Sequence, residues 1–165
     1  MDYLTSKWMI SIYIFIGLGC FLLLIGKKSV HSTISINATP NQVWEVITNT
    51  SQYSEWNSVM NLIEGDIKEG SLVKYRFTQE EGKFYDIPSK VKKIKPSSLL
   101  NQGGGTIGII TFDHKYILED KKGKTVLTIH EDYNGVFVPF WNAEPVQKAY
   151  DRLNKDIKNR TESLY

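Results

Sequence analysis

A long apolar segment lies near the N-terminus of the 165-residue chain. Residues 8–26 carry no charge and are mostly Ile, Leu, Phe, Met and Tyr. At about 1.5 Å per residue, this segment approaches the roughly 30 Å thickness of the hydrocarbon core of a bilayer. Trp8 stands at one end, as expected of an interfacial aromatic, and Lys27 and Lys28 follow the other end. The pattern predicts one transmembrane helix.

A cleaved signal peptide is the alternative to an anchor. Such peptides have a shorter apolar core and a cleavage site of small residues. The segment 17–20, Gly-Leu-Gly-Cys, has some likeness to a lipoprotein cleavage box, but the apolar run continues through 21–25. We therefore expect an uncleaved anchor. One Lys precedes the span and two follow it, so the positive-inside rule places the C-terminal domain in the cytoplasm.

A strand and two short helices are predicted after the anchor. The strand covers 30–36 and leads directly into the helices. Thr39 is suited to cap the first helix, and Pro40 fits its first turn. Three- and four-residue spacings give this helix one buried stripe, made of Val43, Trp44, Val46 and Ile47. Tyr53 and Trp56 repeat the three-residue step and indicate a second, shorter helix.

The pattern then changes to that of β-strands. The predicted strands are 71–79, 85–95, 107–119 and 125–133. The first alternates cleanly, with Val73, Tyr75 and Phe77 on one face. The second is rougher and contains Pro88, which belongs at an edge or a bulge. A turn at 120–124 joins the last two strands into a hairpin.

The last predicted element is a long helix that begins at Pro145. Its apolar stripe consists of Val146, Ala149, Leu153 and Ile157. A curved sheet must cover its apolar concave face, and only this helix is long enough to do so. The sequence thus predicts an α+β fold, in which a curved antiparallel sheet wraps around a long C-terminal helix. We expect two units, the anchor at 1–28 and the folded domain at 29–165.

The order and motifs of these elements resemble a known family. Residues 38–46 read Ala-Thr-Pro-x-x-Val-Trp-x-Val, and 53–57 read Tyr-x-x-Trp-Asn. This pattern is similar to that of the polyketide cyclase/dehydrase and lipid-transport branch of the START-like (SRPBCC, Bet v 1-like) superfamily. The resemblance implies a helix-grip fold, with a cavity for a hydrophobic ligand between the sheet and the last helix. The chain departs from the pattern at 101–105, where relatives often carry a Trp.

The distribution of charge excludes some partners. The formal net charge of +2 lies within residues 1–28, which leaves 17 basic and 17 acidic residues in the rest of the chain. A balanced domain has no general attraction for nucleic acid, so we expect no nucleic-acid partner. Cys20, the single cysteine, lies inside the predicted span and reports nothing about the redox compartment of the domain. The sequence predicts no oligomeric state.

Two patterns that often mark cofactor or metal sites do not indicate such sites in this sequence. Gly103, Gly105 and Gly108 fit G-x-G-x-x-G, but a dinucleotide site needs a helix next, and 109–112 reads as a strand. The histidines are widely spaced and have no cysteine partner, which argues against a zinc site. We predict neither a cofactor nor a metal ion.

His114 stands out among the polar residues, because it alternates with Phe112 and Tyr116 on one face of its strand. On the next strand, either Thr128-His130-Asp132 or Leu127-Ile129-Glu131-Tyr133 faces inward, and a shift of one residue inverts the choice. Both His130 and Glu131 are therefore kept as candidates for the polar groups that orient a ligand in an apolar pocket. The alternative, that these residues are satisfied core or rim groups, stays open.

Aromatic side chains supply the other candidates. Trp44 is assigned to the core, because aromatics at helical spacing most often pack there. Tyr75 and Phe77 lie in mid-strand, and Trp141 precedes the last helix. Phe137 belongs to an apolar cluster that fits a lid, a membrane-contacting lip or packing against that helix. The candidate ligand-binding residues are Trp56, Tyr75, Phe77, Phe112, His114, His130, Glu131, Phe137 and Trp141.

Three functions compete. The resemblance and the lack of a catalytic constellation favour a membrane-anchored protein that holds a hydrophobic small molecule or lipid. The alternative is an enzyme of the cyclase or dehydratase kind, in which His114, His130 or Glu131 moves a proton. An interaction module with an empty pocket ranks third. We expect a single-pass protein that contacts the membrane through residues 8–26, and we assign no catalytic residue.

Overall fold

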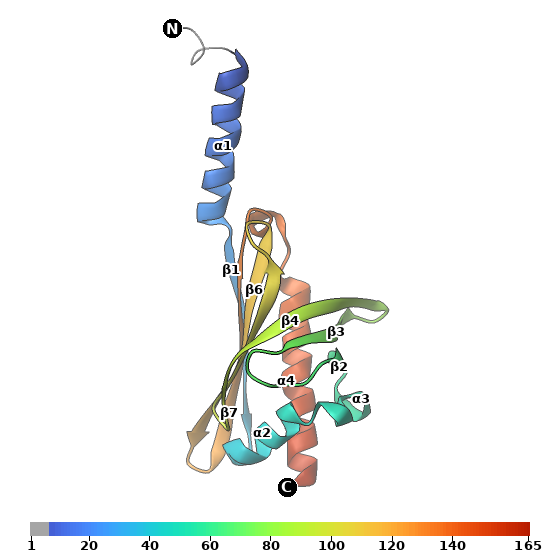
Figure 1. Ribbon diagram of the computed structural model, residues 1–165. Coiled ribbons are helices and arrows are strands. Elements are labelled where there is room, and N and C mark those ends of the chain that lie inside the picture. Colours follow the sequence, from blue (N-terminus) through green and yellow to red (C-terminus); the bar gives the residue numbers. More distant parts are fainter. Residues whose placement is uncertain (1–6) are drawn as a thin grey trace.

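The computed structural model describes residues 7–165 and shows a seven-stranded antiparallel sheet with a long helix across one face (Figure 1). Residues 1–6 of the predicted anchor lie outside the described part. The helices are α1 (Lys7–Ile25), α2 (Pro40–Thr48), α3 (Tyr53–Trp56) and α4 (Glu144–Leu164). The strands are β1 (Lys27–Ile36), β2 (Met60–Glu64), β3 (Leu72–Glu80), β4 (Lys83–Lys95), β5 (Leu99–Thr106), β6 (Ile110–Lys121) and β7 (Lys124–Asn134). Short 3-10 helices occupy Thr50–Gln52 and Val138–Phe140.

The sheet has the strand order β1-β7-β6-β5-β4-β3-β2, and every neighbouring pair is antiparallel. β2 to β7 follow one another as a meander, and β1 pairs with β7 along its whole length. α4 packs against β1, β3, β7 and α2, and its apolar stripe is buried at Val146, Ala149, Leu153 and Ile157. The predicted helix-grip fold is confirmed.

Two of the local predictions hold in detail. The side chain of Thr39 accepts a hydrogen bond from the backbone of Gln42, whose own side chain accepts from the Thr39 backbone, so α2 begins with a capping box. Pro88 lies in β4 opposite Lys74 of β3, and the ladder between β4 and β5 begins only at Lys90. Pro88 therefore has a strand partner on one side, which suits a residue without an N–H group.

The direction of side chains in β7 is now fixed. Its buried residues include Leu127, Ile129, Glu131 and Tyr133, and His114 of β6 is paired with Glu131 across the ladder. The alternation predicted for 71–79 is confirmed, since Val73, Tyr75 and Phe77 of β3 are buried. The inner faces of β3, β6 and β7 thus point toward α4.

The structure also contains elements that the sequence pattern did not indicate. β2 is short, and β5 has no apolar alternation because it combines buried polar residues, Asn101 and Gln102, with a run of glycines. The strand predicted to begin at residue 107 begins at Ile110, because 107–109 form the turn between β5 and β6. Gly105 and Gly108 have φ angles of 94° and 82°, which glycine adopts without strain. A strand, and not the helix of a dinucleotide site, follows them.

α1 extends away from the domain and has no buried residue (Figure 1). Within residues 7–165, it is the one helix long and apolar enough to cross a membrane. A membrane anchor and an N-terminal signal sequence can both meet this criterion of length and composition. Only Gly26 separates α1 from β1, which begins at Lys27, three residues before the predicted start of that strand.

Candidate functional site

A cavity of about 440 Å³ lies between the inner face of the sheet and α4. Its volume falls within the range of pockets that enclose a small organic ligand. Its lining residues are Met60, Tyr75, Phe77, Gln79, Tyr85, Ile87, Ser89, Gln102, Ile110, Phe112, His114, Glu131, Tyr133, Trp141, Val146 and Tyr150. Most of this wall is aliphatic or aromatic, and its polar groups come from β3 to β7 and α4.

Six of the candidate residues lie on the cavity wall. They are Tyr75, Phe77, Phe112, His114, Glu131 and Trp141. The alternation of β3 brings Tyr75 and Phe77 to the cavity, and the alternation of β6 does the same for Phe112 and His114. Trp141 precedes α4, and its ring lies 4.4 Å from that of Tyr133, measured between centroids.

Three candidates lie elsewhere. Trp56 packs edge-on against Tyr53 at a centroid distance of 5.1 Å, beside a second, smaller cavity. His130 occupies the opposite face of β7 from Glu131, where its Nε2 atom lies 3.0 Å from a carboxylate oxygen of Asp132. Phe137 is 58% exposed in the segment between β7 and α4. Period-two alternation explains the position of His130, because neighbours in a strand face opposite sides.

Three polar side chains of the cavity converge on Glu131, which is 4% exposed. The hydroxyl groups of Tyr133 and Tyr150 both donate to its Oε2 atom, the former at 2.5 Å. The Nδ1 atom of His114 lies 3.2 Å from the Tyr150 hydroxyl and 3.9 Å from Glu131 Oε1. We call these four side chains, from β6, β7 and α4, the polar pole of the cavity.

Burial controls the protonation of the polar pole. Burial raises the pKa of Glu131 to about 7, although the hydrogen bonds from Tyr133 and Tyr150 act to lower it. Burial lowers the pKa of His114 to about 4, since the charged imidazolium loses its hydration. The pKa of Glu131 therefore lies above that of His114. Both side chains are neutral between these two values, and no ion pair forms between them.

When Glu131 is ionised, the hydrogen-bond pattern assigns a tautomer to His114. The Tyr150 hydroxyl then donates its single proton to Glu131 and accepts from His114, whose Nδ1 carries the proton. The Nε2 atom of His114 is then a bare acceptor. It is buried and has no hydrogen-bond partner among residues 7–165. A buried, unsatisfied acceptor in a cavity wall is a position at which a ligand can add a hydrogen bond.

Sequence analysis missed several lining residues. Tyr150 lies on the buried stripe of α4 one position after Ala149, so a wider stripe would have included it. Tyr133 lies on one of the two faces of β7, and the sequence did not decide which of these faces points inward. Gln102 had no signal, because β5 lacks alternation. Its amide donates to the Tyr75 hydroxyl at 2.7 Å, and burial raises the pKa of Tyr75 to about 12, which keeps that phenol neutral.

The site supports binding and proton transfer, since it contains neutral donors and acceptors in an apolar enclosure. Among the described residues 7–165, no group of three or more His, Cys, Asp or Glu side chains is arranged to hold a metal ion.

Comparison with known proteins identifies the family of the chain and other proteins with the same fold. Residues 27–162 match the family described as polyketide cyclase/dehydrase and lipid transport. No curated protein sequence matches the chain significantly. Solved structures with a similar fold include Ara h 8.0201, with 14% identity, a TM-score of 0.62, and coverage of 83% of this chain and 99% of that one. Protein CV1439 from Chromobacterium violaceum has 13% identity and a TM-score of 0.67, with coverage of 81% and 96%.

A third similar structure is a point mutant of norcoclaurine synthase from Thalictrum flavum in complex with a transition-state analogue, with 14% identity, a TM-score of 0.58, and coverage of 83% and 95%. At these identities the likeness shows the shared fold alone. The family match, by contrast, covers most of the chain and includes the sheet, the polar pole and nearly all of α4. The chain therefore belongs to the polyketide cyclase/dehydrase and lipid-transport family, as a helix-grip domain that binds hydrophobic ligands.

Proposed function

We propose that the chain is a membrane-anchored binding protein that holds one hydrophobic small molecule or lipid in the cavity between the sheet and α4. The observation that carries this proposal is a mostly apolar cavity of about 440 Å³ in which four polar side chains form one cluster, the polar pole. Six of the candidate residues would contact the ligand, namely Tyr75, Phe77, Phe112, His114, Glu131 and Trp141. A binding protein needs such a wall and no catalytic group.

The proposal assigns residues 1–28 to the anchor and 29–165 to the ligand-binding domain, with the domain in the cytoplasm. Its support is the length and apolar composition of α1 and the excess of Lys on its C-terminal side. The short connection through Gly26 favours a domain that stays close to the bilayer.

The polar pole suggests which chemical group the ligand carries. The Nε2 atom of His114 has no hydrogen-bond partner among residues 7–165, and a ligand hydroxyl, which can both donate and accept, would supply one. The neighbouring carboxyl of Glu131 is uncharged below about pH 7, so the pole suits a neutral group better than an anionic one. We therefore assign the ligand to apolar molecules that carry one hydroxyl at the end that enters the cavity.

A pair of matched ligands tests this assignment. Dodecan-1-ol and n-dodecane are allowed to compete with a neutral apolar dye, N-phenyl-1-naphthylamine, for the full chain in detergent. Replacing His114 by Phe should weaken dodecan-1-ol binding about 5- to 10-fold, the usual value of one neutral hydrogen bond, and leave dodecane binding unchanged. Each ligand partitions into the micelles to the same extent in the wild-type and variant experiments, so this partition cancels when the two affinities are compared. An equal loss of affinity for the two ligands would show that His114 does not bind the hydroxyl group.

An acid–base enzyme is the second candidate, and the arrangement of Glu131 favours it. Its pKa of about 7 is suited to proton transfer near neutral pH, and Tyr150 links it to His114. In a cyclisation, such a group would remove a proton from the carbon between two ketones, and that carbon would attack another carbonyl of the same chain.

Incubation with a linear poly-ketone, followed by mass spectrometry, tests for catalysis. An enzyme should give a cyclised product that has lost water, and Glu131→Gln should slow its formation at least about 100-fold, as expected when a general base is removed. A ligand recovered unchanged with the wild-type protein would favour binding without reaction.

A further inference from the structure

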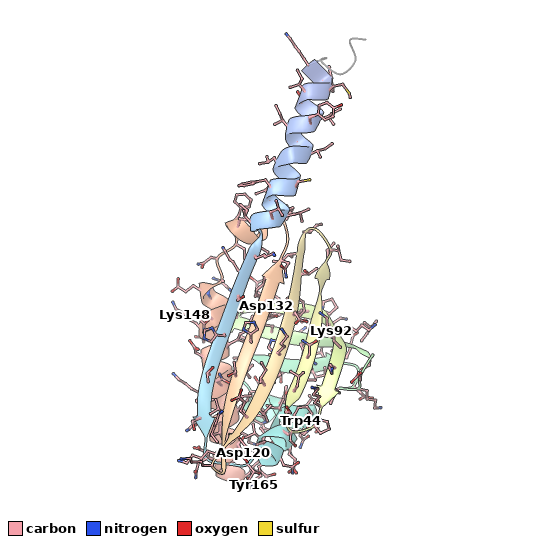
Figure 2. The ribbon with its side chains drawn as sticks, turned by 90° about the vertical axis from the view of Figure 1, so that its left-hand side faces the viewer. Trp44, Lys92, Asp120, Asp132, Lys148 and Tyr165 are labelled. Atoms are coloured by element: carbon pink, nitrogen blue, oxygen red, sulfur yellow. The ribbon has the colours of Figure 1, made fainter. Side chains whose placement is uncertain are left out.

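The two ends of the sheet differ in charge. At the end far from α1, the β6–β7 turn contains Asp120, Lys121, Lys122 and Lys124, and Figure 2 shows Asp120 at that end. At the end next to α1, the β5–β6 turn lies within residues 96–112 and the connection from β7 to α4 covers 135–143. Neither of these segments contains a charged residue. The two loops beside α1 are therefore uncharged, and the charges nearest to them are those of Lys27 and Lys28 at the start of β1.

Backbone contacts hold these segments together at the exit of α1. The N–H of Gly135 donates to the carbonyl of Gly26 at 2.9 Å. The N–H groups of Val136 and Phe137 donate to the carbonyls of Gly108 and Ile109 at 3.1 and 3.3 Å. The first residue of β1, Lys27, pairs with the last residue of β7, Asn134. The two segments thus lie beside the point at which α1 joins the domain (Figure 1).

Large apolar side chains project from this surface into solvent. Ile107 is 92% exposed, Phe140 75%, Phe137 58% and Ile109 47%. We call these four residues the apolar rim. Exposed apolar residues are ordinary when scattered, but these gather on two adjacent segments that carry no charged residue, which is typical of an interaction site. The nearest charge is that of Lys28, whose ammonium group donates to the backbone carbonyls of Pro139 and Trp141.

The apolar rim also adjoins the cavity. Ile110 follows the β5–β6 turn directly and lines the cavity, as does Trp141, which follows Phe140. These two residues and Phe112 are only partly buried, whereas His114 and Glu131 are buried deeper in the site. The cavity therefore approaches the surface beside the rim, and its polar pole lies farther inside. It also reaches the surface at Tyr85 of β4, which lines it and is 52% exposed.

We propose that the apolar rim inserts into the interfacial layer of the same bilayer that α1 crosses, so that the mouth of the cavity opens at the membrane surface. This inference rests on the proposed membrane anchor. The occupant is a bilayer because the connection through Gly26 leaves no room for the rim to move away from the end of the span. Insertion of uncharged loops carrying Ile and Phe is favourable at the boundary of headgroups and acyl chains. An apolar ligand then passes between bilayer and cavity without crossing water.

Site-directed spin labels test the docking without any ligand. The full chain with Cys20→Ser is reconstituted in phosphatidylcholine vesicles and labelled at Ile107→Cys, Phe140→Cys, Phe15→Cys or Lys122→Cys, one position at a time. Accessibility to oxygen and to a water-soluble nickel chelate then reports depth in the bilayer. Labels at 107 and 140 should show an oxygen-to-nickel accessibility ratio several-fold above that of the label at 122, which lies at the far end of the sheet. Their ratio should approach that of the label at 15, inside α1.

The outcomes separate docking from the other proposals. A shielded label at 15 with labels at 107 and 140 as exposed as that at 122 would overturn docking and leave the anchor in place. Shielding of 107 and 140 that disappears at one copy per vesicle would identify a second copy as the occupant and also overturn it. Shielded labels in a protein that binds no apolar dye would support docking and contradict the proposed ligand function.

A matched pair of substitutions adds a functional measurement. Ile107→Asp should slow transfer of N-phenyl-1-naphthylamine from vesicles to the protein several-fold and leave the dye affinity in detergent unchanged. Leu72→Asp, at a residue that is 75% exposed outside the rim, should leave both unchanged. Equal transfer rates for the two variants would count against the rim as the route of entry.

Discussion

Replacing Ser89 by Trp should weaken binding of N-phenyl-1-naphthylamine about 100-fold, because the indole would occupy the cavity. Ser89 is a small, buried residue on the inner face of β4, and it lines the site. If the indole displaces about 100 Å² of apolar dye surface, a value of about 25 cal/mol per Å² gives a loss of about 2.5 kcal/mol. The measurement is a fluorescence titration of the full chain in detergent, with the signal of empty micelles subtracted.

The adjacent residue offers a matched control. Lys90 is exposed on the opposite face of the same strand, so Lys90→Trp adds the same ring outside the cavity and should leave dye affinity unchanged. Val146→Trp, on the α4 wall, should reproduce the loss from the other side of the cavity. Chemical denaturation shows whether each variant folds. Wild-type affinity in folded Ser89→Trp and Val146→Trp proteins would contradict a binding site between the sheet and α4.

Two substitutions in the polar pole should change the pH dependence of stability in opposite directions. Glu131 has a pKa of about 7 in the fold against an ordinary 4.5, so between these values the folded state keeps a proton that the unfolded state has lost. The free energy of unfolding that Glu131 contributes is present below pH 4.5 and is lost as the pH rises to about 7. The difference between the two pKa values corresponds to about 3 kcal/mol in the free energy of unfolding.

His114 acts with the opposite sign. Its pKa is about 4 in the fold against an ordinary 6.5, so between these values the unfolded state binds the extra proton. Its contribution to the free energy of unfolding is present above pH 6.5 and is lost as the pH falls to about 4, again about 3 kcal/mol. The effects of Glu131 and His114 largely cancel in the wild-type protein between pH 4.5 and 6.5.

Denaturation of wild-type and variant proteins from pH 4 to 8 separates the two contributions. The wild-type free energy of unfolding minus that of Glu131→Gln should fall by about 3 kcal/mol between pH 4.5 and 7. The difference for His114→Phe should rise by about 3 kcal/mol between pH 4 and 6.5. Taking differences removes the titration of the other carboxylates. Parallel curves for the three proteins would show that neither group has a displaced pKa.

Local patterns in the sequence predicted most elements because each pattern has a direct physical cause. The capping box at Thr39, the alternation of β3 and the stripe of α4 depend on residues close together in the chain. The sequence pattern did not predict β5, because this central strand consists largely of glycines and buried polar residues. Its neighbours β4 and β6, and not its own alternation, stabilise it.

The candidate site was predictable only in part. Phe112 and His114 could be placed on one face from β6 alone, and Tyr75 and Phe77 from β3 alone. His130 and Glu131 could not be separated, because they are adjacent in a strand and only the pairing of β6 with β7 decides which one faces α4. Phe137 and Trp141 belong to one apolar cluster, yet the first faces solvent and the second faces the cavity.

The sequence by itself determined the apolar N-terminal helix, the order of most elements, the pairing of the β6–β7 hairpin and the resemblance to the family. Only the tertiary structure decided the inner face of β7, the place of β5, the meeting of Glu131, Tyr150 and His114, and the existence of the cavity. The physical reason is that a periodic pattern records which residues avoid water, and those residues would have the same pattern in a filled core. The space left between a curved sheet and a helix depends on how two layers fit together.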